Sequence, residues 1–176
     1  MDISDLLKQK MKTIPDWPKP GVLFHDITSV LGDAEAYRAV VDDFADRYWG
    51  NVDVIVGIDA RGFIMGGAIA YALGLPFVPV RKKGKLPGET IRQTYDLEYG
   101  TDTLEMQKGA LAPGQRAVVI DDLLATGGTA GAAASLVERL GGTVAELAFV
   151  VNLKGLGGRK RLEDAGRRVY AQATYE

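Results

Sequence analysis

The chain has 176 residues, of which 47% are apolar and 25% are charged, and its formal net charge is −2. This length and composition suit one globular domain with a real core, and the small net charge excludes a global basic field that would recruit nucleic acid. Cysteine is absent and His25 is the single histidine, which excludes disulfides, thiolate metal sites and histidine clusters around zinc.

The first twelve residues predict a short amphipathic helix. Ile3, Leu6, Leu7 and Met11 are spaced along one helical face, with charged residues between them. This mixture is not typical of a signal peptide, and no apolar stretch approaches the ~20 residues that a membrane span needs. We therefore expect a cytoplasmic protein with no membrane partner.

The chain then predicts an alternation of strands and helices after a proline-rich stretch. Pro15, Pro18 and Pro20 favour an extended path over residues 13–33. Runs rich in valine and isoleucine predict buried strands at residues 52–58, 76–81 and 117–120. Helical patterns follow the first and last of these strands, at residues 60–73 and 129–140. Strands without polar alternation are typical of parallel sheets covered on both faces, so the pattern predicts an α/β fold with a mostly parallel sheet.

Residues 82–109 interrupt this alternation with a polar segment rich in glycine and proline. A period-two apolar pattern then predicts a hairpin whose residues Ile91, Tyr95, Leu97 and Tyr99 share one face. Such an excursion within a compact domain is often a mobile functional loop. An exposed hairpin with no role is the alternative.

Two adjacent carboxylates, Asp121 and Asp122, follow the strand predicted at residues 117–120. In open α/β sheets, ligands bind outside the carboxyl ends of the strands. Carboxylates there accept hydrogen bonds from sugar hydroxyls or hold a hard cation. Turn capping is the simpler explanation, but it accounts poorly for two acids directly after an apolar strand.

The turn of small residues after these acids predicts an anion site. Its members are Ala125, Thr126, Gly127, Gly128 and Thr129. They open a helix, whose N-terminus offers free N–H groups and a positive dipole end, while the glycines allow close approach and the threonines add donors. Carboxylates that can bind sugar hydroxyls, next to a turn that can bind a phosphate, predict a site for ribose 5-phosphate. The sequence lacks the lysine-containing pattern of a nucleotide P-loop.

Residues 118–129 resemble the phosphoribosyl-pyrophosphate motif of type I phosphoribosyltransferases, in the sequence variant that is found in adenine-specific members. Further stretches are similar to the family's hood (18–27), pyrophosphate loop (59–63), flexible catalytic loop (81–90 and 95–100) and base-contacting segment (152–154). The resemblance implies a mostly parallel central sheet flanked by helices, with a small N-terminal hood and a flexible loop hairpin. It further implies one domain over residues 1–176, with the hood at 1–33, the core at 34–154 and the loop at 82–109.

The same resemblance implies a purine salvage reaction. Adenine and 5-phosphoribosyl 1-pyrophosphate give AMP and pyrophosphate, with Mg²⁺ bound mainly through substrate and water. It also implies a homodimer. Two alternatives stay open: transfer to another purine base such as xanthine or hypoxanthine, and a non-catalytic regulator that senses phosphoribosyl pyrophosphate. A regulator should carry a DNA-binding segment, and the sequence has no clear helix-turn-helix or basic patch.

Roles follow from the resemblance for four groups of residues. The ribose-phosphate group is Asp121, Asp122, Ala125, Thr126, Gly127, Gly128 and Thr129. The pyrophosphate group is Asp59, Ala60, Arg61, Gly62, Arg81, Lys82 and Lys85, and the resemblance implies a cis peptide bond in this loop. The adenine group is Leu23, His25 and Leu153, with His25 where the family commonly has arginine. The catalytic candidates are Arg61 and Glu98, the latter for proton handling at the adenine ring; the alternative for Glu98 is a solvent-facing strand residue.

Overall fold

The computed structural model describes residues 1–97 and 99–176, so Glu98 lies outside the described residues. Within them, the strands are β1 (Lys12–Pro15), β2 (Leu23–Asp26), β3 (Val54–Ile58), β4 (Phe77–Lys82), β5 (Thr90–Asp96), β6 (Thr101–Gln107), β7 (Arg116–Leu124), β8 (Thr143–Leu153) and β9 (Val169–Tyr175). The helices are α1 (Ile3–Lys10), α2 (Thr28–Leu31), α3 (Ala34–Tyr48), α4 (Gly62–Leu73), α5 (Gly128–Arg139) and α6 (Gly158–Asp164), with a 3-10 turn η1 (Lys154–Leu156).

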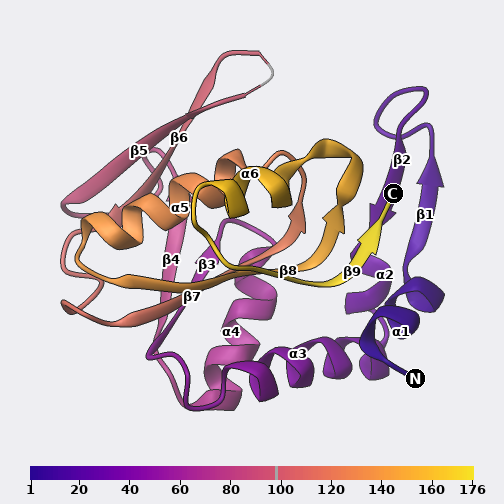
Figure 1. The fold of residues 1–176 in the computed structure, drawn as a ribbon, viewed down its shortest axis with the longest axis horizontal. Coiled ribbons are helices and arrows are strands. Elements are labelled where there is room, and N and C mark those ends of the chain that lie inside the picture. The colour runs from indigo at the N-terminus through magenta and orange to yellow at the C-terminus, as the bar shows by residue number, and fades with distance from the viewer. Residues whose placement is uncertain (98) are drawn as a thin grey trace.

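A mixed sheet forms the centre of the molecule (Figure 1). In the described part of the chain it has the strand order β5-β6-β4-β3-β7-β8-β9. The run from β4 to β9 is parallel, whereas β6 pairs antiparallel with both β4 and β5. The predicted α/β fold with a mostly parallel sheet is therefore confirmed.

Strand β7 is longer than the sequence pattern predicted. The predicted strand ended at Ile120, but β7 continues through both acids to Leu124. Pairing with β8 carries it on, since Leu123 lies opposite Val151 and Leu124 opposite Asn152. The acids therefore lie within a central strand, close to its carboxyl end, and not in the loop that follows it.

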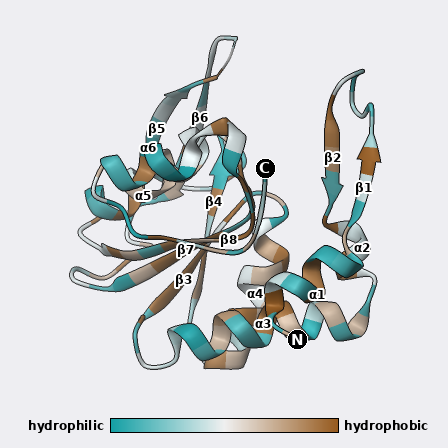
Figure 2. Ribbon diagram, turned by 45° about the vertical axis from the view of Figure 1, so that its right-hand side comes forward, coloured by the Kyte–Doolittle hydropathy of each residue, from teal (hydrophilic) through white to brown (hydrophobic). Residues whose placement is uncertain are grey.

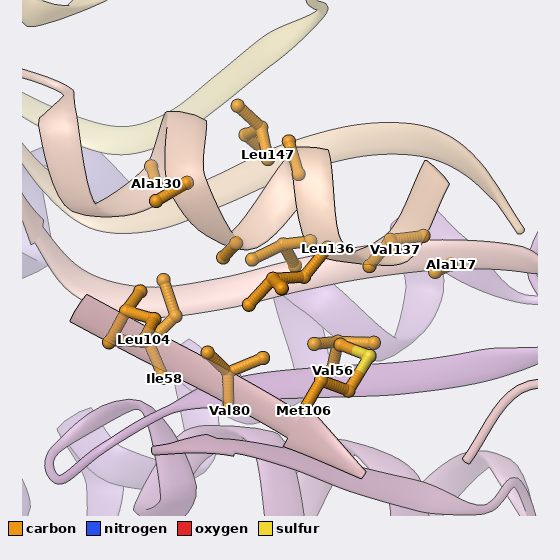
Figure 3. Packing of buried hydrophobic residues seen from close by; sticks show 14 of the residues in the cluster. Val56, Ile58, Val80, Leu104, Met106, Ala117, Ala130, Leu136, Val137 and Leu147 are labelled. Atoms are coloured by element: carbon orange, nitrogen blue, oxygen red, sulfur yellow. The ribbon is translucent and has the colours of Figure 1, made fainter. Parts of the chain in front are cut away.

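Helices cover both faces of the sheet, and a separate apolar cluster lies between each face and the helices that cover it. Figure 1 shows α5 and α6 on one face and α3 and α4 on the other. The cluster under α5 joins Val56 and Val80 of the sheet to Leu136 and Val137 of the helix (Figure 3). The opposite cluster contains Phe44 of α3 and Met65 of α4. Figure 2 shows the central strands mostly in brown, with teal segments along α3, α5 and α6, whereas α4 is mostly white to brown.

The predicted N-terminal helix is confirmed as α1, but the proline-rich stretch is not simply extended. It forms an antiparallel hairpin in which Thr13 pairs with His25 and Pro15 with Leu23. Helix α2 follows, and Asp26 accepts hydrogen bonds from the backbone and hydroxyl of Thr28 at 3.0 and 2.6 Å. This polar turn of Asp26 directly precedes a helix that the proline pattern did not predict.

The predicted β5–β6 hairpin is present, with Asp96 opposite Thr101 at its tip. Ile91 and Tyr95 pack on the apolar cluster under α5. Leu97 and Tyr99 lie beyond the end of β5 and are 46% and 87% exposed. The prediction that all four apolar residues share one face was therefore wrong for the last two, because the strand ends before them.

The two hairpins, β1–β2 and β5–β6, project from the molecule in the same direction (Figures 1 and 2). Near the C-terminus, the ring of Tyr175 lies against that of His25 on β2. In the part of the chain that the structure describes, no helix combines the length and apolar character needed to cross a membrane.

Candidate functional site

Asp121 and Asp122 lie side by side near the carboxyl end of β7, between the flanking strands β3 and β8. Asp122 is 6% exposed, and its backbone N–H donates to Oδ1 of Asp121 at 2.8 Å. Burial and then the neighbouring charge of Asp122 raise the pKa of Asp121 well above its usual range. Two carboxyl groups are thus concentrated where an α/β sheet binds ligands.

The turn after β7 is closed by the start of α6. Gly127 has φ +87°, a conformation that favours glycine, and α5 begins at Gly128. The backbone N–H of Gly158 donates to the carbonyl of Ala125 at 3.1 Å, and a Cβ on Gly158 would lie 2.3 Å from that oxygen. The turn encloses a hollow of about 90 Å³ lined by Asp121, residues 123–130 and Phe149. This hollow at a helix N-terminus suits an anion.

The predicted pyrophosphate loop packs directly against the two acids. Its Asp59–Ala60 peptide bond is cis, as the family resemblance implied. A Cβ on Gly62 would lie 2.6 Å from the carbonyl oxygen of Ile120, so only glycine lets α4 approach β7 this closely. Nε of Arg61 then reaches Oδ2 of Asp122 at 2.5 Å. The two predicted half-sites therefore meet at this pair.

The carboxylate of Asp59 gathers two of the predicted pyrophosphate cations. Its Oδ2 accepts a hydrogen bond from Nε of Arg81 at 3.2 Å, and Nζ of Lys85 lies 3.6 Å away. The side chain of Asp59 is 7% exposed, so its carboxylate contacts these cations and is shielded from an anion bound outside the loop. Lys82 is directed elsewhere, because its ammonium pairs with Asp102 on β6.

The base-side residues meet at the C-terminus of the chain. The His25 ring stacks on that of Tyr175, with 4.0 Å between centroids, and its Nδ1 lies 3.2 Å from the Thr13 hydroxyl. Tyr175 is the strand partner of Leu153. His25 and Leu153 are thus brought together through Tyr175, whereas the side chain of Leu23 is 63% exposed. Partial burial lowers the pKa of His25, which favours the neutral form of its ring.

Sequence reasoning missed three residues that the structure places at this site: Tyr175, Gly158 and Arg161. Arg161 of α6 lies beside the phosphate turn, with Nη1 3.5 Å from the carbonyl of Thr126. The Gly157-Gly158 pair is a detectable signal in the sequence, because adjacent glycines permit a close backbone contact. Tyr175 offers no local motif, since its role depends on the packing of the last strand against β2.

Comparisons with known proteins agree with this geometry. Residues 33–169 match the family described as "Phosphoribosyl transferase domain". An adenine phosphoribosyltransferase of Chlorobium phaeobacteroides (strain BS1) is 53% identical over 97% of this chain and 98% of its own length. The crystal structure of an adenine phosphoribosyltransferase from Thermoanaerobacter pseudethanolicus is similar, with a TM-score of 0.91, 48% identity and coverage of 97% and 99%. So is that of the Saccharomyces cerevisiae enzyme with D-2,5-dideoxy-2,5-imino-altritol 1,6-bisphosphate and adenine, with a TM-score of 0.91, 38% identity and coverage of 97% and 98%.

Proposed function

Because the chain belongs to the adenine phosphoribosyltransferase family, we propose that the acids on β7 and the loops packed around them form its active site. The chain transfers the 5-phosphoribosyl group from phosphoribosyl pyrophosphate to adenine, giving AMP and pyrophosphate in purine salvage. The observation that carries the assignment of the site is the contact of Arg61 with Asp122, which joins the pyrophosphate loop to the ribose-phosphate strand.

The ribose and its 5-phosphate occupy the strand end and the turn after it. Asp121 and Asp122 accept hydrogen bonds from the ribose hydroxyls. Carboxylates suit this role, because they are acceptors and cannot donate hydrogen bonds to a phosphate. The 5-phosphate lies in the hollow of the turn, where the backbone N–H groups of residues 125–129 and the hydroxyls of Thr126 and Thr129 act as donors. Gly127 and Gly128 allow this approach.

The pyrophosphate lies against the loop of residues 59–62. As the bond from C1′ to the pyrophosphate oxygen breaks and the bond from C1′ to the adenine nitrogen forms, negative charge grows on the leaving group. Arg61, Arg81 and Lys85 stabilise that charge, with Lys82 as a further cation when its bond to Asp102 opens. The backbone of Asp59 contacts the pyrophosphate, and its carboxylate keeps Arg81 and Lys85 close to the site before substrate binds.

The base lies beneath the β1–β2 hairpin, near His25, Leu153 and the more exposed Leu23. Glu98 handles a proton or hydrogen bond at the adenine ring, a role proposed from the family resemblance alone. In this proposal residues 1–176 form one domain, residues 1–33 are its hood, and residues 82–109 close over the reactants.

Mg²⁺ completes the proposal as a cofactor. Among the described residues, no group of three or more histidine, aspartate and glutamate side chains could hold a metal ion. The carboxyl oxygens of Asp121 and Asp122 are hard donors of the kind that Mg²⁺ prefers and would help to hold it, with the ion bound mainly through substrate and water. When bound, the ion neutralises negative charge on the pyrophosphate.

A homodimer and a cytoplasmic location belong to the same proposal. Ile64 and Tyr71 are 42% and 89% exposed on α4, two helical turns apart and therefore on one face. Exposed apolar side chains at such spacing support an interface with a second copy. The cysteine-free sequence supports a reducing compartment.

The test of the function is the formation of AMP by the purified protein from adenine, phosphoribosyl pyrophosphate and Mg²⁺. Parallel assays with hypoxanthine, xanthine, guanine and uracil decide the base. We expect the highest kcat/KM for adenine and no turnover without Mg²⁺. A higher kcat/KM for another base would overturn the adenine assignment, and binding of phosphoribosyl pyrophosphate without any turnover would favour a regulator.

A further inference from the structure

The buried carboxylate of Glu105 on β6 contacts both ends of the segment that carries Lys85. Glu105 is only 2% exposed. Its Oε1 accepts a hydrogen bond from the backbone N–H of Gly84 at 2.9 Å, and its Oε2 accepts one from the hydroxyl of Thr90 at 2.8 Å. Nε of Arg92, its partner across the hairpin, lies 3.2 Å from Oε1. One side chain therefore ties down the start and the end of residues 84–90.

These contacts keep Glu105 charged. The hydroxyl of Thr90, followed by the N–H of Gly84, lowers the pKa of Glu105. Hydrogen bonds to an ionised acceptor are about twice as strong as those between neutral groups. A buried charge is costly unless it is bonded in this way, so the carboxylate and the loop ends stabilise each other.

The loop that Glu105 holds is the one that supplies cations to the site. Arg81 lies directly opposite Glu105 in the pairing of β4 with β6. Nη1 of Arg81 also lies 3.4 Å from the carbonyl of Lys85, and both cations converge on Asp59. The position of Lys85 relative to Arg81 thus depends on where its short loop begins and ends.

We propose that Glu105 is a positioning residue for the pyrophosphate half of the reaction. It touches no substrate; it fixes residues 84–90 so that Lys85 and Arg81 meet the pyrophosphate together. The inference rests on the proposed pyrophosphate role of these two cations. A purely structural role for Glu105 predicts a general loss of stability, whereas a positioning role predicts a selective loss of affinity for the pyrophosphate-bearing substrate.

A second buried carboxylate provides a matched control. Glu146 on β8 is 6% exposed and accepts two hydrogen bonds from Arg47, at 2.8 and 2.9 Å, and one from the hydroxyl of Tyr48 at 2.8 Å. Like Glu105, which has two hydrogen bonds and an ion pair with Arg92, it is a buried charged acceptor with polar partners. It bonds α3, on the sheet face opposite α5, and contacts none of the residues proposed to bind substrate.

The experiment compares Glu105→Gln with Glu146→Gln by the KM for each substrate, inhibition by pyrophosphate, and Tm. For Glu105→Gln we expect the KM for phosphoribosyl pyrophosphate and the inhibition constant for pyrophosphate to rise about tenfold, since displacements of about 1 Å cost this much or more. The KM for adenine should stay within about twofold. Glu146→Gln should lower Tm while leaving the KM for phosphoribosyl pyrophosphate within about twofold.

Thr90→Val provides a milder variant, because it removes one donor to Glu105 and keeps the side-chain shape. We expect its KM for phosphoribosyl pyrophosphate to rise about threefold, and this variant decides the matter if Glu105→Gln does not fold. An unchanged KM in the folded variant, or an equal rise for both substrates, would overturn the positioning role. Lys85→Ala distinguishes the proposed pyrophosphate site from the proposed positioning role of Glu105. If Lys85→Ala leaves the KM for phosphoribosyl pyrophosphate unchanged, the proposed pyrophosphate site is wrong. If Lys85→Ala raises it and Glu105→Gln does not, only the positioning role is wrong.

Discussion

Nε of Arg61 lies 2.5 Å from Oδ2 of Asp122, so a cation proposed for pyrophosphate and an anion proposed for ribose hydroxyls hold each other. The carboxylate side chain is 8% exposed and the arginine side chain 52% exposed. Binding of phosphoribosyl pyrophosphate would therefore exchange this ion pair for two sets of substrate contacts. Because about half of the arginine side chain is exposed, solvent screens this ion pair, which limits the cost of that exchange.

Asp122→Asn is expected to reduce kcat/KM for phosphoribosyl pyrophosphate about ten- to a hundredfold, because it removes charge-assisted hydrogen bonds worth about 1.5–3 kcal/mol. The KM for adenine should change little. Steady-state kinetics with each substrate varied in turn provides the measurement.

Asp53→Asn is the control for this change. Asp53 pairs with Arg116 at 3.1 Å, at the opposite end of β7, and its side chain is 40% exposed. It is therefore expected to leave both KM values unchanged. Equal kinetics for the two variants would remove Asp122 from the ribose site.

Gly62→Ala is expected to disable the site by packing alone. The added Cβ would lie 2.6 Å from the carbonyl oxygen of Ile120, a backbone atom that cannot move without shifting β7. Overpacking of this kind costs about 1–3 kcal/mol or more, so we expect a lower Tm together with lower activity.

Gly67→Ala tests the same substitution in the same helix without the clash. Within one subunit, no heavy atom lies within 4 Å of a Cβ at Gly67. Its Tm should be unchanged or raised, because alanine is favoured over glycine in a helix by about 0.5–1 kcal/mol. A Gly62→Ala protein as active and stable as Gly67→Ala would contradict the close packing of the loop on β7.

The sequence was sufficient to predict the parts of the site that are contiguous in the chain. Asp121, Asp122 and the glycine turn form one run after a valine-rich strand, and the rule that ligands bind at strand ends then places the ligand. The parallel sheet followed from buried strands alternating with helices. The exact end of β7 did not, because polar residues within a strand look like its end until the pairing with β8 is known.

Contacts between distant segments could not be predicted in this way. The approach of Arg61 to Asp122 joins residues 61 positions apart, and Asp59 gathers cations from β4 and the following loop. The link between Tyr175 and His25 depends on how the last strand packs against the first hairpin. No local pattern encodes such tertiary geometry, although the resemblance to a family indicated which segments should converge.

Tyr71→Glu is expected to dissociate the proposed homodimer. Tyr71 is 89% exposed on α4, and a charge placed within an apolar interface would be desolvated without a partner. Sedimentation velocity over a range of protein concentrations would report the change. Trp49→Glu is the matched control, since Trp49 is an exposed aromatic residue (70%) at the end of a different helix, α3. A wild-type monomer, or equal behaviour of the two variants, would contradict this interface.

Asp121→Asn is expected to stabilise the protein while impairing catalysis. Burial and the adjacent Asp122 raise the pKa of Asp121, so the folded protein holds this proton more tightly than the unfolded chain does. Above the raised pKa the wild type must bury a charge on folding, and its stability falls as pH rises through the range between the unfolded and folded pKa values. Asparagine carries no charge, so Tm should exceed that of the wild type at pH 8.

The size and pH dependence of this gain distinguish it from ordinary repacking. Each 1 kcal/mol of relief should raise Tm by about 2–4 °C in a chain of this length. The advantage should shrink as pH falls toward 4, where Asp121 in the wild type is already protonated. Asp122→Asn should show a smaller gain, because it relieves the repulsion between the two acids but also removes the ion pair with Arg61. Thermal melts of the three proteins from pH 4 to 8 provide the measurement, and a Tm difference independent of pH would contradict the raised pKa of Asp121 as its source.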